Sequence, residues 1–185
     1  MSSLKGVILL VVVTLVFAVG SFAIQLKERP NHKEVQKGEQ IVAAEGSIAP
    51  DFELSDFNGN RTSLSRWQGK VVLVDFWATW CTYCIEEMPQ LQKIAKDYGR
   101  DLVVLGIHRT ETESLEVAKS FVVEKGLTYT MLIDSDGEIF KKYDMGHNLM
   151  PVAAIVGKDG KVFKLLYGVK DMGEVKNLID IAKAG

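Results

Sequence analysis

The sequence predicts an α/β fold in which a mixed central sheet carries helices on both faces, with an N-terminal hairpin extension and one transmembrane helix before it. Two observations predict the α/β part. Apolar runs typical of buried strands alternate with segments of helical spacing, and the last two strand-like runs are separated by a short glycine-containing turn. A long uncharged run near the N-terminus predicts the transmembrane helix.

The uncharged run GVILLVVVTLVFAVGSFAI covers residues 6–24. A helix of this length spans about 29 Å, close to the hydrocarbon thickness of a bilayer. The apolar region of a secretory signal usually has only about 7–15 residues, which favours a retained anchor. A cleaved signal stays open, because SFA at residues 21–23 has the small residues of a cleavage site. Basic residues are more frequent after the run than before it, but long domains translocate largely regardless of flanking charge.

The chain divides into three parts. We assign residues 1–26 to a membrane anchor or uncleaved signal, residues 27–46 to a polar tether, and residues 47–185 to the folded domain. The formal net charge is −2 and the only basic run is a pair of lysines, so nothing predicts a nucleic-acid partner.

The first half of the domain begins with a hairpin and continues into a buried strand. DFELSD and NGNRTSL, within residues 51–64, have hairpin character with Asn-Gly as the turn. KVVLVDFW, residues 70–77, is a continuous apolar run typical of a strand buried on both faces. Residues 82–99 have the apolar spacing of a helix, and Gly99 suits its C-terminal end.

The second half continues the alternation, with a strand at residues 102–108 and a helix that starts from a Ser114 cap and ends at Gly126. Further strands are expected at residues 128–134, 152–156 and 162–168, and helices at residues 137–144 and 173–184. The last two strands form a hairpin through GKDGK, whereas the strand–helix–strand units imply parallel pairing with right-handed crossovers.

The only two cysteines, Cys81 and Cys84, lie three positions apart in WATWCTYC. A structural zinc site needs four ligands, and the three histidines of this chain are scattered, so a metal site is a minor alternative. Covalent haem needs a histidine directly after the second cysteine, where Ile85 stands. A structural disulfide closing so small a loop would stabilise the fold little. A redox pair is the favoured interpretation.

Redox chemistry suits this spacing at a helix N-terminus. If Thr82 opens the helix, Cys81 lies where free N–H groups and the helix dipole favour a thiolate. Cys84 follows one turn later on the same face, so it can resolve a mixed disulfide by intramolecular attack. We therefore expect Cys81 to be the exposed nucleophile and Cys84 to be the more buried resolving cysteine.

The stretch VLVDFWATWCTYC, residues 72–84, resembles the active-site strand and turn of thioredoxins, and Pro89 matches the proline of their active-site helix. The wider pattern resembles the membrane-anchored, extracytoplasmic branch of TlpA, ResA and CcmG type proteins. It includes APDFELSDFNGNRTSLSRWQGK, LVVLGIH, an inserted helix around GEIFKKYD, and MPVAAIVGKDGKV. The similarity covers residues 48–183, and it implies a thioredoxin-like fold for essentially the whole domain.

The resemblance implies roles for residues around the cysteines. Pro151 would be the cis-proline that faces the disulfide, and Met150 before it would line the groove for a substrate peptide. Trp80 and Trp77 match thioredoxin tryptophans, with plain packing as the alternative for either.

Two acidic residues receive the same kind of assignment. Asp75 stands in the apolar strand where thioredoxins keep a buried acid, and burial would raise its pKa and allow proton exchange with Cys84. Its alternative is an acid that points outward at the strand end. Glu87 matches the active-site glutamate of ResA-type proteins, and its alternative is a first-turn acid that stabilises the helix dipole.

The sequence departs from its relatives between the cysteines, where Thr82 and Tyr83 stand instead of a dipeptide that often ends in proline. This dipeptide helps to set the reduction potential, so the direction of electron flow stays open. The residues VAA after Pro151 also replace a TTF-like run, which affects how a substrate docks.

We therefore expect a single-pass protein of the bacterial cytoplasmic membrane that carries a thiol–disulfide oxidoreductase domain on the periplasmic side. The resemblance favours a disulfide reductase of cytochrome c maturation or related protein-thiol reduction, with protein disulfides as substrates and apocytochrome c as the first choice. The other expected partners are a membrane thiol electron donor and the lipid bilayer. We expect no metal and no cofactor besides a redox-active disulfide between Cys81 and Cys84.

Two other functions compete with this one. A peroxiredoxin-like peroxidase shares the opening pattern, but it needs a threonine and a proline at set positions before its cysteine, and Thr79 and Trp80 do not match them. A non-enzymatic copper- or peptide-binding module is the second alternative.

Overall fold

The computed structural model describes residues 42–185. The expected membrane anchor and all but the end of the expected tether lie outside the described residues. Within residues 42–185, no helix has both the length and the apolar character needed to cross a bilayer. At the start of this part, Ala43 is fully buried and its N–H donates to the Lys142 carbonyl at 2.7 Å.

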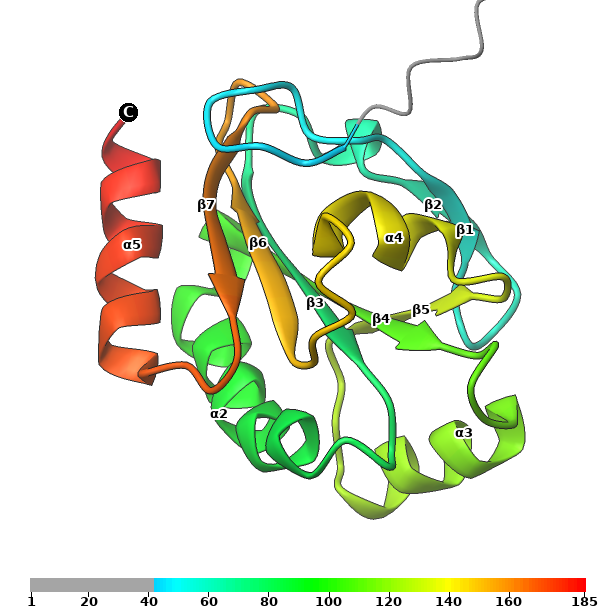
Figure 1. The fold of residues 1–185 in the computed structure, drawn as a ribbon. Helices are drawn as coiled ribbons and strands as arrows, with labels where there is room; N and C mark the ends of the chain where they lie inside the picture. The colour runs from blue at the N-terminus through cyan, green and yellow to red at the C-terminus, as the bar shows by residue number, and fades with distance from the viewer. Residues whose placement is uncertain (1–41) are drawn as a thin grey trace, which may run out of the picture. The chain divides into compact units, whose positions relative to one another are not determined.

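The centre of the fold is a five-stranded sheet of order β5-β4-β3-β6-β7 (Figure 1). Its strands are β3 (Val71–Trp77), β4 (Leu102–Arg109), β5 (Thr130–Asp134), β6 (Val152–Val156) and β7 (Val162–Tyr167). The strands β3, β4 and β5 are parallel, whereas β6 pairs antiparallel with β3 and β7 pairs antiparallel with β6. The expected mixed sheet and the expected C-terminal hairpin are confirmed.

Helices cover both faces of the sheet (Figure 1). One face carries α2 (Thr82–Tyr98), α3 (Leu115–Glu124) and α5 (Met172–Ala184). The other face carries α4 (Glu138–Asp144), and the N-terminal hairpin of β1 (Glu53–Ser55) and β2 (Arg61–Ser63) lies beside β5. Two 3₁₀ turns complete the elements, η1 (Ser65–Trp67) and η2 (Gly99–Asp101).

The strand β3 forms the spine of both cores because all seven of its residues are buried. Side chains alternate across a strand, so Val71, Leu73 and Trp77 join the core under α2, α3 and α5, while Val72, Val74 and Phe76 join the core under α4. A strand that is buried on both faces needs the continuous apolar run that predicted it. Asp75 is the one charged residue in this run, and its position places it on the α2 side.

Local capping explains where the helices begin and end. The Ser114 hydroxyl accepts from the Val117 N–H at 3.4 Å at the start of α3, and the Asp171 carboxylate accepts from the first N–H groups of α5. Gly99 ends α2 with a φ of 54°, a left-handed value that favours glycine. The Asn-Gly turn of the N-terminal hairpin is confirmed, with Gly59 at φ 89°.

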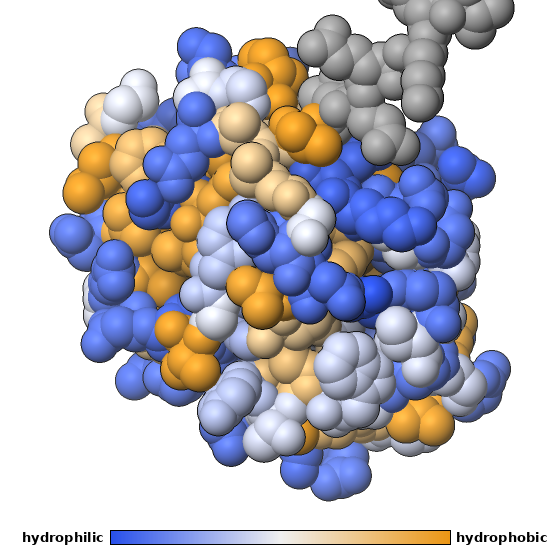
Figure 2. Space-filling view, in the orientation of Figure 1, coloured by the Kyte–Doolittle hydropathy of each residue, from blue (hydrophilic) through white to orange (hydrophobic). Residues whose placement is uncertain are grey.

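The surface around α4 mixes hydrophilic and hydrophobic residues, and hydrophobic side chains are also visible between β7 and α5 (Figure 2). Large apolar side chains exposed singly are common on soluble domains. Those that matter here lie beside the cysteines, and they are described with the site.

Candidate active site

The two cysteines form a disulfide at the start of α2, after the short loop that follows β3. Their Cα atoms are 5.3 Å apart. Cys81 is the N-cap of α2, and its Sγ accepts a hydrogen bond from the Cys84 N–H at 3.3 Å. The predicted helix start at Thr82 is confirmed. Both cysteines are buried in the oxidised pair: Cys84 is 1% exposed, as expected for a resolving cysteine, but Cys81 is only 6% exposed rather than the exposed residue that we expected.

This position gives the pair its chemistry. The first N–H groups of a helix have no partner within the helix, so a reduced Cys81 can be stabilised there as a thiolate. Cys84 lies one turn further along α2, in the same core cluster as Trp77 and Met88. The Cys84 sulfur is bonded to the Cys81 sulfur in the oxidised pair, so the same position allows a Cys84 thiolate to attack Cys81 in an intramolecular exchange.

Three charged side chains are buried together on the α2 side of β3. They are Asp75 from the strand, Glu87 from the helix, and Lys170 from the loop between β7 and α5. The Lys170 Nζ lies 2.6 Å from Glu87 Oε2 and 3.5 Å from Asp75 Oδ1. The outward-pointing alternative for Asp75 is wrong, because this residue is only 1% exposed. The helix-dipole alternative for Glu87 is also wrong, because the first turn of α2 holds no acid and both carboxylate oxygens of Glu87 accept hydrogen bonds from Lys170.

Burial dominates the electrostatics of Asp75. It raises the pKa of this carboxyl to about 6, while the charge of Lys170 lowers the value and that of Glu87 raises it. The Oδ1 atom has no hydrogen-bond partner within residues 42–185, so its attraction to Lys170 is electrostatic rather than a well-aligned hydrogen bond. A carboxyl that titrates near neutral pH can take up and release protons during exchange chemistry.

Gly106 in β4 pairs with Asp75, and a Cβ added there would lie 2.8 Å from Met131 Sδ and 3.0 Å from Tyr129 Cε2. A larger residue at this position would therefore fit only if these side chains shifted. Burial, together with the Asp75 charge, raises the pKa of Tyr129 well above its usual value, so the phenol beside this acid stays neutral.

The loop before Cys81 is held by Glu113, which lies in the loop between β4 and α3. Its carboxylate accepts from the Thr79 N–H at 2.6 Å and from the Thr79 hydroxyl, and it pairs with His108 Nε2 at 2.7 Å. The Trp80 Nε1–H donates to the Thr112 hydroxyl at 3.0 Å, although the side chain remains 52% exposed. Trp77 is fully buried against His108, with ring centroids 4.8 Å apart, so packing accounts for Trp77.

The Met150–Pro151 peptide bond is cis, as the resemblance implied. The loop that leads to Pro151 is held by Asp144 at the end of α4, whose carboxylate accepts hydrogen bonds from the N–H groups of Asn148 and Leu149. The Pro151 carbonyl accepts from the Gly168 N–H at 2.9 Å, which ties this loop to the β7–α5 loop. Pro151 is buried, Met150 is half-buried and Leu149 is 51% exposed, so the loop presents apolar side chains at its surface.

Sequence reasoning identified the cysteines and the buried acid, but it missed the polar residues that hold them. These are Lys170, Glu113, His108 and Asp144. The one available signal was Asp75 itself, since a charge in an apolar strand demands a partner somewhere in the chain. No three His, Cys, Asp or Glu residues within the described part of the chain are grouped so that they could hold a metal ion.

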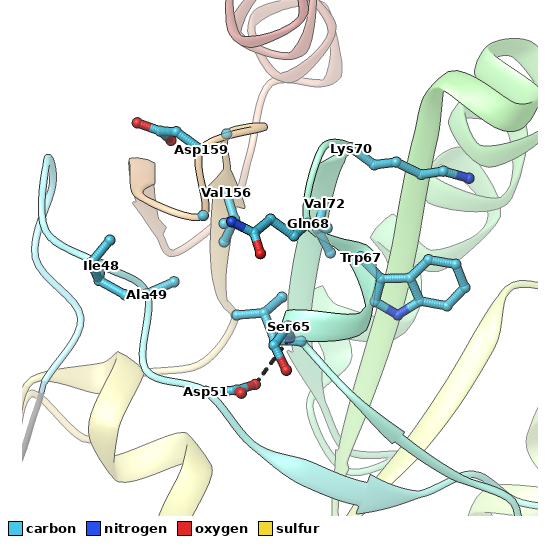
Figure 3. A pocket seen from close by; sticks show the side chains of 13 residues that line it. Ile48, Ala49, Asp51, Ser65, Trp67, Gln68, Lys70, Val72, Val156 and Asp159 are labelled. Atoms are coloured by element: carbon cyan, nitrogen blue, oxygen red, sulfur yellow. Dashed lines mark hydrogen bonds between the residues drawn. The ribbon is translucent and has the colours of Figure 1, made fainter.

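A well-defined pocket of about 190 Å³ lies at the other end of β3, away from the cysteines (Figure 3). Ala49, Leu64, Val72 and Val156 give it an apolar floor, and Asp51 at its rim accepts from the Ser65 N–H at 3.1 Å. Its charged lining residues Asp51, Lys70 and Asp159 are exposed, and neither cysteine lines it. The redox chemistry of the molecule is therefore assigned to the cysteine end of β3.

Comparisons with known proteins agree with this site. Residues 46–164 match the AhpC/TSA family. The thiol–disulfide oxidoreductase ResA of Geobacillus thermodenitrificans is 32% identical over 145 residues, which are 78% of this chain and 82% of that protein.

Two solved structures share the fold. A candidate thiol:disulfide interchange protein DsbE of Chlorobium tepidum has a TM-score of 0.69 at 26% identity, covering 76% of this chain and 99% of that one. The exposed lipoprotein thioredoxin of Streptococcus pneumoniae has a TM-score of 0.59 at 30% identity, covering 71% of this chain and 99% of that one. The chain therefore belongs to the AhpC/TSA family, and it is a thiol–disulfide oxidoreductase of the ResA and DsbE type that carries the Cys81–Cys84 pair.

Proposed function

We propose that this chain is an extracytoplasmic reductase of protein disulfides, held at the membrane by residues 6–24. The observation that carries the proposal is the Cys81–Cys84 pair at the N-terminus of α2, with the buried Asp75 behind it. The uncharged N-terminal run and the similarity to an exposed lipoprotein of Streptococcus pneumoniae support the compartment.

The reaction begins with the reduced pair. The Cys81 thiolate attacks one sulfur of a substrate disulfide, forms a mixed disulfide, and releases the other substrate sulfur as a thiolate. Cys84 then loses its proton and attacks Cys81 Sγ, so the Cys81–Cys84 bond forms and the bond to the substrate breaks. The substrate gains two electrons as a dithiol and the enzyme pair is oxidised. Because the pair must be reduced again outside the cytoplasm, a membrane thiol electron donor is the second partner.

The other predicted residues serve binding and proton transfer in this scheme. In this proposal Met150 and Pro151 line the groove for the substrate peptide, and the exposed ring of Trp80, which directly precedes Cys81, contacts the same peptide. Asp75 exchanges a proton with Cys84, and Glu87 acts through its contact with Lys170. As the client we propose apocytochrome c, reduced before haem attachment, because the sequence resembles proteins of the ResA and CcmG type.

The reduction potential of the Cys81–Cys84 couple tests the direction of electron flow. A reductase should have a potential near that of thioredoxin, about −270 mV, whereas a value near −120 mV would make the protein an oxidant. The measurement is equilibration of the purified protein with glutathione or dithiothreitol buffers.

Trapping tests the roles of the two cysteines. The C84S variant should accumulate a mixed disulfide when it is mixed with apocytochrome c in its disulfide form, and C81S should not. If both variants bound the client as well as the wild type, a non-enzymatic binding module would be favoured instead.

The match to the AhpC/TSA family keeps peroxide reduction as a second candidate. Here Cys81 would be oxidised by the peroxide and Cys84 would close the disulfide. Hydrogen peroxide turnover that exceeds the rate of protein-disulfide reduction would replace the proposed function with this one.

A further inference from the structure

Lys170 is the most unusual charged residue of the site, because its side chain is only 2% exposed. Lysine is almost never fully buried unless it is paired. Here the backbone N–H donates to Glu87 Oε1 at 2.7 Å, and the ammonium donates to Glu87 Oε2 at 2.6 Å. Both carboxylate oxygens of Glu87 are therefore occupied by a single residue, and the same ammonium also faces Asp75 at 3.5 Å.

The loop that carries Lys170 is fixed on both sides. Before it, Gly168 adopts a left-handed φ of 73° and donates its N–H to the carbonyl of Pro151. After it, Asp171 caps α5 by accepting from the N–H groups of Gly173 and Glu174. The backbone of the Lys170 loop is therefore tied to the cis-proline loop, and the Lys170 ammonium links the cysteine helix to the central strand.

The charges of this cluster do not balance when both acids are ionised. One ammonium faces two carboxylates in a buried site, so the cluster is neutral only when one of the two acids is protonated. Glu87 is tied to Lys170 by two hydrogen bonds, whereas Asp75 Oδ1 has none within residues 42–185. Tyr129, which stays neutral beside Asp75, and the cysteine pair of α2 belong to the core on this same side of β3. Asp75 is thus the group of the cluster whose proton can change.

We propose that Lys170 is a positioning residue of the exchange reaction, which holds Glu87 as a fixed carboxylate and keeps Asp75 ready to accept the proton of Cys84. This inference rests on the proposed thiol–disulfide exchange. In the resolving step the Cys84 thiol gives its proton to Asp75, the Cys84 sulfur bonds to Cys81 Sγ, and the substrate sulfur leaves with the electron pair of the broken bond.

The K170M variant removes the cation but keeps most of the length of the side chain. The Lys170 charge lowers the pKa of Asp75, so without it this pKa rises and Asp75 is protonated at neutral pH. An opposite charge at this distance commonly shifts a pKa by about 1–3. The resolving step should therefore slow at least about twofold at pH 7 and recover at pH 9, with its midpoint about one pH unit higher or more.

The reaction of the reduced full-length protein with 5,5′-dithiobis(2-nitrobenzoate) separates the two steps. Attack by Cys81 releases one nitrothiobenzoate in a phase that depends on reagent concentration. Attack by Cys84 on the mixed disulfide releases the second in a phase that does not. Stopped-flow absorbance from pH 5 to 9 gives a pH profile for each phase, and we expect K170M to move the second profile much more than the first.

A second pair of variants avoids leaving two buried carboxylates without a cation. E87Q keeps Lys170 beside Asp75, and K170M/E87Q removes both members of the ion pair. Because the Lys170 charge lowers the Asp75 pKa, the second-phase profile of K170M/E87Q should lie at higher pH than that of E87Q. K176M is the matched control, since Lys176 on α5 has a half-buried side chain that pairs with Asp97 rather than with the two buried acids. Its profile should match the wild type.

Three outcomes decide the matter. Shifted profiles in K170M, or in K170M/E87Q against E87Q, support the role of Lys170. Superimposed profiles, or an equal slowing of both phases at every pH, would overturn it. Absence of a second phase in the wild type would instead overturn the proposed exchange function, so the two failures can be told apart.

Discussion

The folded state buries the Asp75 carboxyl, although an ionised carboxylate is more stable in water than in a protein interior. The pKa of Asp75 rises from 3.8 to about 6 because the carboxyl is fully buried. The native state thus binds this proton more tightly than the unfolded chain does. Stability linked to Asp75 is therefore fully present below about pH 4, and it declines as the pH rises to about 6. This pKa difference lowers the free energy of unfolding above pH 6 by about 3 kcal/mol, compared with its value below pH 4.

We expect D75N to stabilise the oxidised protein at pH 7 by up to about 3 kcal/mol and to have no such effect at pH 4. The measurement is urea unfolding at a series of pH values. Asp134 also has a pKa raised by burial to about 6, so the wild type and D75N share that contribution and only their difference reports on Asp75. A D75N protein that is less stable than the wild type at pH 7 would show that the buried charge is well compensated.

Among the elements, the loop after β3 depends on a carboxylate from the next strand connection. Burial would raise the pKa of Glu113, but hydrogen bonds from Thr79 and His108 outweigh this effect and lower it. His108 is fully buried, and burial lowers its pKa despite the facing Glu113. Glu113 therefore satisfies the donors of two elements that meet beside Cys81.

Replacing Glu113 with Ala should destabilise the protein by about 2–4 kcal/mol, because it leaves buried donors on Thr79 and His108 without an acceptor. E113Q should cost less, since the amide oxygen still accepts. The matched control is E124A on α3, whose side chain is 71% exposed and pairs only with Lys125. Equal urea midpoints for E113A and E124A would contradict the assignment.

The short helix α4 acts on the site through its last residue. Asp144 is buried, and its carboxylate binds two backbone N–H groups of the loop that leads to Pro151. Met145 and Asn148 in this loop have positive φ values of 55° and 49°, a strained conformation for residues other than glycine. The carboxylate therefore maintains a loop shape that the local sequence does not favour.

We expect D144A to raise the KM for a protein disulfide about fivefold, the equivalent of about 1 kcal/mol, because the loop that docks the peptide is loosened. The rate with a small aromatic disulfide should change little, since that reagent needs only Cys81. E138Q, an exposed change on the same helix, serves as the control. Equal losses with both substrates would mean that Asp144 supports the fold rather than the docking loop.

At the scale of the whole molecule, the elements could be predicted because their signals are local. The run VVLVDFW predicts its own strand because it is apolar at every position except Asp75, and Ser114 and Gly99 mark helix ends within one turn. The cysteine pair carries its chemistry in four consecutive residues, 81–84. The contacts of Lys170 could not be predicted, because the ammonium meets carboxylates that are 83 and 95 residues away in the sequence. Nothing in GVKD signals that this lysine points inward.

The fold brings these distant segments to one place through the order of its strands. The neighbours of β3 are β4 and β6, so the loops after β4 and before β6 lie on either side of the loop that leads to Cys81. The β7–α5 loop reaches the same end because β7 pairs antiparallel with β6. Sequence patterns predict each strand, but the polar bonds between these loops depend on the complete sheet.

The remaining prediction concerns the N-terminal run at residues 6–24, whose 19 uncharged residues suit a membrane span. The full chain, expressed in a bacterium, should remain in the membrane fraction after carbonate washing, with Met1 or Ser2 as its N-terminus. Residues 42–185 alone should be recovered in the soluble fraction with the same reduction potential, because the site lies entirely within them.

A V12R substitution, which costs about 3 kcal/mol at the centre of a span, should weaken retention in the membrane. A mature N-terminus shortly after Ala23, found by mass spectrometry, would instead identify residues 1–23 as a cleaved signal.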